Sequence, residues 1–149
     1  MLRETLTTDM KAAMKSRDQA RLDTIRMLLS ALKNEEISLR RPMNGEEEIA
    51  FLSSQAKRRR ESITAFEEAG RDEMARTERA ELEVINAYLP EQLSAEEARS
   101  IIAEVIAAVG ASAPSDLGRV MGAVMPKLKG RFPGSDVRPI VQELLAGNG

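Results

Sequence analysis

The side chains best suited to bind a ligand gather near the C-terminal end of the sequence. Between Leu117 and Arg138 the chain has five basic residues against one acidic residue, Asp136, although the whole protein has a net charge of −2. The five are Arg119, Lys127, Lys129, Arg131 and Arg138. Lysine and arginine form charge-assisted hydrogen bonds with phosphate and displace counterions from nucleic acids. This set predicts a phosphate-binding surface; the alternative is a solvated face whose positive charge stabilises a helix end.

The composition argues against catalysis. The chain has no cysteine and no histidine, which removes thiol nucleophiles, Cys/His zinc sites and the commonest general base. Adjacent carboxylates are abundant, in Glu35-Glu36, Glu46-Glu47-Glu48, Glu67-Glu68 and Glu96-Glu97. General acid–base catalysis needs two groups in unlike environments, whereas capping and solubility explain these runs. We therefore predict no catalytic residue, no metal site, no cofactor and no enzymatic activity in this chain.

Two further motifs have both a structural and a functional interpretation. In the run Lys57-Arg58-Arg59-Arg60, Arg59 interrupts an apolar seam, so we expect it to pair with an acid from another helix or to mark a cleft. Arg58 is expected to face solvent. Gly118 and Gly122 share one helix face, where we expect close packing against a neighbouring helix. The alternative is that the missing side chains let RNA approach the backbone.

Apolar residues repeat at helical spacing through the whole chain, and only 3% of residues are aromatic, so we predict an all-α protein. Asn44 and Ser94 are typical N-caps, and Glu97 completes a capping box with Ser94. The expected helices cover approximately 2–14, 22–32, 45–69, 72–89, 95–109, 115–128 and a short final segment at 137–145.

A hinge at Tyr88–Leu93 predicts two domains, a four-helix domain at residues 1–92 and a three-helix domain at 93–149. Nothing near the N-terminus resembles a signal peptide, and no apolar stretch approaches the roughly 20 residues of a membrane span. We expect a soluble, cytoplasmic protein without membrane contact.

The chain resembles the GatB/YqeY family over nearly its whole length. The residues that carry this resemblance are Arg21-Leu22, Ile25–Leu29, Asn34–Ile37, Lys57–Ile63, the hinge sequence Tyr88–Leu93 and the segment Asp116–Gly130. The resemblance implies that the three-helix domain is similar to the tail of the amidotransferase B subunit, which belongs to an enzyme that amidates mischarged tRNA and whose tail helps to hold the tRNA. The catalytic body of that subunit has no counterpart here. One departure is Phe132-Pro133-Gly134, where family members often have a small residue and an Asp before the glycine.

From these observations we predict a non-catalytic tRNA-associated binding module whose nucleic-acid-binding residues are the five basic ones. The alternative is a protein-interaction adaptor of the translation or aminoacylation machinery, without RNA affinity, that works through the N-terminal half. A third possibility is amidotransferase-type carbon–nitrogen ligase activity only as part of a larger complex, with aminoacylation or amidotransferase proteins as partners.

Overall fold

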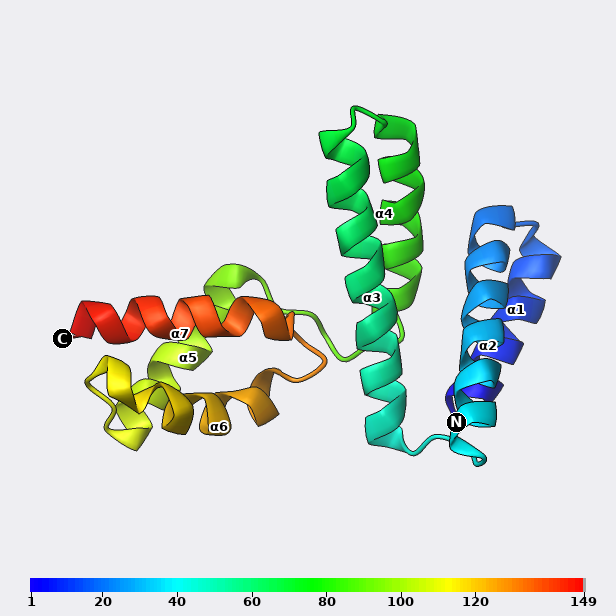
Figure 1. Cartoon of the computed structure of the whole chain (residues 1–149). Coiled ribbons are helices and arrows are strands. Elements are labelled where there is room, and N and C mark those ends of the chain that lie inside the picture. The colour runs from blue at the N-terminus through cyan, green and yellow to red at the C-terminus, as the bar shows by residue number, and fades with distance from the viewer. Residues whose placement is uncertain (149) are drawn as a thin grey trace. The chain divides into compact units, whose positions relative to one another are not determined.

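The computed structural model describes residues 1–148 and is built from α-helices joined by short turns (Figure 1). The helices are α1 (Leu2–Ser16), α2 (Gln19–Leu39), α3 (Gly45–Glu68), α4 (Asp72–Asn86), α5 (Ala95–Val109), α6 (Leu117–Leu128) and α7 (Gly134–Asn148), with a short 3₁₀ turn η1 at Pro114–Asp116. No β-strand occurs in the described part of the chain, so the all-α prediction is confirmed.

The chain forms two compact units, which we call unit 1 (Met1–Leu89) and unit 2 (Pro90–Gly149). Unit 1 contains α1 to α4, and unit 2 contains α5 to α7. The division lies between Leu89 and Pro90, within the hinge predicted from the sequence. Gln92 belongs with unit 2, since its side-chain amide donates to the Gly130 carbonyl at 2.6 Å. The Leu93 amide donates to the Arg131 carbonyl at 2.8 Å, which ties the start of unit 2 to the α6–α7 turn.

Two helix starts follow directly from the sequence. The Asn44 side chain accepts a hydrogen bond from the Glu47 amide at 2.9 Å, and the Glu47 carboxylate accepts one from the Asn44 amide at 3.1 Å. Ser94 and Glu97 make the same reciprocal pair at the start of α5, at 3.1 and 3.0 Å. Both capping predictions are therefore confirmed, and each satisfies donors that the first helical turn leaves free.

Unit 1 is assembled from two helical hairpins, α1 with α2 and α3 with α4, and α2 also packs against α4. Its core residues are Leu2, Leu6, Ile25, Leu28, Leu32, Phe51, Leu52, Ala56 and Ile85. Polar contacts join the two hairpins: the Tyr88 hydroxyl donates to Asp9 at 2.5 Å, and the Leu2 amide donates to Glu48 at 2.7 Å. Burial and the Asp9 carboxylate raise the pKa of Tyr88 above its ordinary value, so this hydroxyl stays a donor.

Unit 2 encloses a core made only of aliphatic side chains. The buried residues are Ile102, Val105, Ile106, Ala111, Val120, Val124, Leu128, Val137, Val141 and Leu145. Apart from Ala111, which follows α5, they come from all three helices of the unit, because each helix repeats its apolar residues at intervals of three and four.

Several helix boundaries differ from the sequence-based ranges. Helix α1 continues to Ser16, and α2 spans Gln19–Leu39 rather than 22–32, because its ends are mostly polar and lie outside the apolar repeat. Helix α4 ends at Asn86, and residues 87–89 form turns before Pro90. Helix α6 begins at Leu117 because η1 occupies the preceding residues. The last helix is not short: α7 begins at Gly134, directly after Pro133, and includes Pro139. Its first residues are polar or small, so the apolar repeat used to predict this helix begins only at Val137.

Within residues 1–148 no single helix is long and apolar enough to cross a membrane. Helices α5 and η1–α6 pass such a test only as a pair bent by 98°. Their apolar residues form the core of unit 2.

Candidate functional site

All five basic residues predicted to bind nucleic acid lie in unit 2, four of them on or directly after α6. Arg119 and Lys127 lie on α6, Lys129 and Arg131 follow it, and Arg138 lies on α7. All are exposed except Arg131, which is half-buried and donates to the Glu91 carbonyl at 3.4 Å. Arg119 lies 3.4 Å from the Asp116 carboxylate. Among the described residues, Lys127, Lys129 and Arg138 form no salt bridge, so their charges face solvent.

One face of α6 is open down to its backbone. At about 100° per residue, Gly118, Gly122 and Pro126 fall on the side of the helix opposite the buried Val124, and all three are exposed. A Cβ atom added to Gly118 or Gly122 would meet nothing within 4 Å. The prediction that these glycines pack closely against another helix is therefore wrong: the apolar side of α6 is formed by other residues, and the glycines face outward.

The start of this face carries one carboxylate whose charge is already satisfied. Asp116 accepts hydrogen bonds from the backbone amides of Ser112 and Ala113, at 3.0 and 3.1 Å, and these bonds hold its pKa below the ordinary value. The carboxylate fixes the turn before α6 and also pairs with Arg119. It does not neutralise the lysines at the other end of the helix. Lys127 and Lys129 lie at the C-terminal end of α6, where Lys127 projects about 140° round the helix from Gly122.

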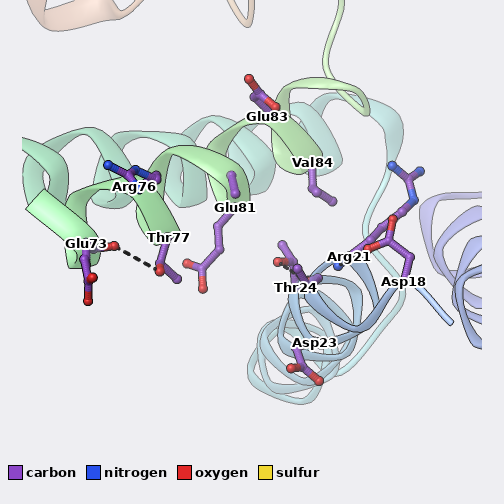
Figure 2. Close-up of a pocket in the computed structure, with 12 residues that line it drawn as sticks. Asp18, Arg21, Asp23, Thr24, Glu73, Arg76, Thr77, Glu81, Glu83 and Val84 are labelled. Carbon is purple, nitrogen blue, oxygen red and sulfur yellow. Dashed lines mark hydrogen bonds between the residues drawn. The ribbon is translucent and has the colours of Figure 1, made fainter.

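Unit 1 contains a groove of about 850 Å³ between α2 and α4, shown in Figure 2. Its lining is rich in acids. The charged lining residues are Asp18, Asp23, Glu73, Glu81 and Glu83 against Arg21 and Arg76. Small and branched side chains, among them Ala80 and Val84, complete the lining. This excess of carboxylates suits a cationic ligand and would repel a phosphate backbone.

Beside this groove, a salt-bridge cluster joins α3 to α4. The Arg59 Nε atom lies 2.8 Å from a carboxylate oxygen of Glu81 and 3.6 Å from one of Glu78, and only 12% of the Arg59 side chain is exposed. The prediction that Arg59 pairs with acids of another helix is confirmed, and Arg58 is exposed as expected. Burial raises the pKa of Glu81 above its ordinary value, although the Arg59 charge acts in the opposite direction.

Sequence reasoning found the basic residues of unit 2 but missed the acidic groove. Asp18, Asp23 and Glu73 each look like ordinary polar residues near a helix start, and only the packing of α2 against α4 brings them together. The described residues contain no group of three or more acids placed to hold a metal ion.

The structure thus defines an all-helical protein of two units, one with an open helix face and nearby exposed basic residues, and one with an acidic groove. Residues 3–145 match the family described as Yqey-like protein. The chain belongs to this YqeY-like protein family.

Named relatives share the descriptor "Altered inheritance of mitochondria protein 41, mitochondrial". The protein from Eremothecium gossypii is 38% identical over 85 residues, which cover 56% of this chain and 46% of that protein. The one from Candida glabrata is 33% identical over 126 residues, covering 80% of this chain and 69% of that protein. A Saccharomyces cerevisiae protein is 33% identical over 85 residues, 56% of this chain and 46% of its own length. The matched region thus spans about half the length of the first of these relatives.

Proposed function

We propose that this chain is a non-catalytic RNA-binding module that holds the phosphate backbone of a structured RNA, with tRNA as its candidate ligand. The observation that carries the proposal is the outer face of α6. There Gly118 and Gly122 leave the helix backbone open, and the exposed Lys127 and Lys129 supply positive charge, without a salt bridge to any described residue, at the C-terminal end of the same helix. A glycine inside an exposed helix costs about 0.5–1 kcal/mol relative to alanine, and packing does not explain either glycine here.

Structured RNA fits such a face better than a small anion does. RNA helices are recognised mainly through shape, phosphate and 2′-hydroxyl contacts, so aromatic stacking is not required and a smooth helix face is suitable. The lysines at the C-terminal end of α6 would contact successive phosphates, while Arg119 and Arg131 would extend the contact on either side. Arg138 on α7 adds charge to the same unit.

The choice of tRNA rests on the resemblance of unit 2 to the amidotransferase B subunit tail. The names of the relatives assign those proteins to mitochondria. For this chain we propose a soluble protein in a compartment that contains tRNA, either the cytoplasm, as the sequence predicts, or a mitochondrion, as in the relatives.

The proposal is tested by titrating the protein into fluorescently labelled bulk tRNA at several salt concentrations. Lys127→Glu/Lys129→Glu is the test variant, and Lys11→Glu/Lys15→Glu is the matched control, because it makes the same charge change on exposed residues of α1 in unit 1. We expect salt-sensitive binding by the wild type and the control. The test variant should bind much more weakly, and its plot of log affinity against log salt should be shallower by about two.

Equal affinity of the two double variants would refute a phosphate contact at the end of α6. Absence of wild-type binding even at low salt would refute RNA binding by the isolated protein.

The acidic groove supports a second candidate, the protein-interaction adaptor. Apart from Glu81, which is paired with Arg59, four carboxylates against two guanidinium groups line this groove of about 850 Å³, and they match a basic segment of a partner protein rather than an RNA. Binding of such a partner should be unchanged in Lys127→Glu/Lys129→Glu and should be lost in Glu73→Lys/Glu83→Lys. The two candidates therefore predict opposite responses to these two double variants.

A further inference from the structure

A second groove in unit 1 lies between α2 and α3 and has a volume of about 480 Å³. Leu39, Met43 and Phe51 form part of an apolar lining, and the amides of Asn34 and Gln55 also face it. Its size falls in the range of about 300–1,000 Å³ that is typical of small-molecule pockets. Of the twelve lining residues, five are apolar and seven are polar or charged, so the groove has a mixed lining.

Gln55 is the unusual residue in this lining. Only 7% of it is exposed, yet none of the hydrogen bonds between described residues involves its side-chain amide. The atoms of this amide are not fully enclosed, and Gln55 lines the groove, so the amide can be reached from the groove. Because the amide can be reached from the groove, a ligand that offers both a donor and an acceptor can bond to it in place of solvent.

The charges around the groove favour a neutral ligand. The Glu47 carboxylate is already held by the Arg41 guanidinium through hydrogen bonds of 2.7 and 3.0 Å. Glu35 and Arg58, which also line the groove, carry opposite charges and are both exposed. No excess of either sign therefore remains, in contrast to the acidic groove between α2 and α4.

We propose that the α2–α3 groove binds an unpaired nucleobase, adenine before the others, with its hydrogen-bonding edge on Gln55. A planar neutral base has an apolar face for Leu39, Met43 and Phe51 and a polar edge for the rest of the lining. Glutamine and asparagine amides pair in two-bond fashion with the N6 and N7 positions of adenine. Arg58 would meet the phosphate of the same nucleotide. This inference rests on the proposed RNA-binding function for the source of the base, because single-stranded loops and ends of RNA expose such bases.

The test compares fluorescently labelled ten-residue oligoadenylate and oligouridylate. The wild type should bind oligoadenylate about tenfold or more tightly, as expected for a two-bond base contact. Gln55→Leu should abolish this preference while keeping the weaker, salt-dependent binding of both oligonucleotides, and Asn34→Ala should reduce the preference. Gln142→Leu, an exposed glutamine on α7, is the matched control and should retain it. Thermal unfolding of each variant verifies that it is folded.

A wild type that binds both oligonucleotides equally, or a Gln55→Leu variant that keeps the preference, would overturn the inference and leave the proposed function standing. If no RNA binds, the proposed function fails and the groove is tested alone with free adenosine, by following the NMR signals of the Gln55 side-chain amide. Saturable shifts there, absent from Gln142, would support the base-binding groove. An unchanged Gln55 signal would overturn it.

Discussion

The two units differ in where their charged and polar side chains lie. The core of unit 2 is entirely aliphatic, and its arginines and lysines lie at the surface. Unit 1 buries two polar residues, Thr24 and Gln55, and keeps the Arg59–Glu78–Glu81 cluster largely out of water. Its grooves include one that is acidic, between α2 and α4, and one that is neutral, between α2 and α3.

This difference indicates which surface suits which ligand. Charges at the surface of unit 2 keep their full hydration until a polyanion displaces counterions, so they can bind RNA at little internal cost. In unit 1 the partly buried charges pair with one another, and the remaining carboxylates give the α2–α4 groove a net negative charge. A polyanion is attracted to the first surface and repelled by this groove.

The largest effects are expected from the two separate cores. Leu128→Ala in unit 2 and Leu52→Ala in unit 1 each remove a side chain that is at most 2% exposed, so each should lower the free energy of unfolding by about 2–5 kcal/mol. By amide hydrogen exchange, Leu128→Ala should speed exchange mainly in α5–α7 and Leu52→Ala mainly in α1–α4. Equal loss of protection across both units in both variants would contradict this division.

Arg59→Met tests the cluster of unit 1. Removing the guanidinium leaves Glu78 and Glu81 side by side and partly buried, which should cost about 2–3 kcal/mol at neutral pH. The pKa of Glu81 is already raised, so the folded state takes up a proton more readily than the unfolded state as the pH falls toward the ordinary value of 4.5. The cost should therefore shrink with falling pH in urea unfolding experiments.

The matched control for this prediction is Arg58→Met, on the exposed side of the same helix, which should change stability by less than about 0.5 kcal/mol. Equal costs for Arg58→Met and Arg59→Met would show that the cluster does not stabilise unit 1.

Gly118→Ala and Gly122→Ala separate folding from binding on the face of unit 2. Because a Cβ atom has open space at both positions, each change should stabilise the protein by about 0.5–1 kcal/mol. The same changes should weaken tRNA binding if the RNA backbone approaches α6 closely. Thermal unfolding and tRNA titration measure the two effects. Stabilisation with unchanged affinity would show that the glycines are not part of the RNA interface.

The smallest effect concerns acid sensitivity. The backbone amides of Ser112 and Ala113 lower the folded-state pKa of Asp116, so this carboxylate stabilises unit 2 above its ordinary pKa of 3.8. That stabilisation fades as the pH falls below 3.8 through the folded-state value. Asp116→Asn should be less stable at neutral pH and lose less stability on acidification, as followed by melting temperature at pH 7 and pH 3. An equal loss in variant and wild type would contradict this role.

The sequence was sufficient for features set by local chemistry. Asn44 and Ser94 were predictable as caps because their partners lie three residues away, and Arg59 was predictable as a paired residue because it interrupts an apolar seam. The helical class followed from the apolar periodicity, and the basic residues from their composition.

Features that depend on how helices pack could not be predicted. The spacing of Gly118 and Gly122 is the same for glycines that pack against a helix and for glycines that face solvent, so only the position of the core decides between them. The two grooves of unit 1 require α2 to be placed against α3 and α4, and no pattern within one helix contains that information. For the same reason Gln55, a polar residue in a charged helix, gave no signal of its burial.

The most direct test of RNA binding by unit 2 is an NMR titration of the isotope-labelled full-length protein with bulk tRNA. The account predicts that the backbone amide signals of Gly118, Gly122, Lys127 and Lys129 shift or broaden first, while those of Lys11 and Lys15 on α1 do not respond. Changes centred on α1, or on the α2–α4 groove with α6 unaffected, would contradict the assignment of the RNA-binding face to α6.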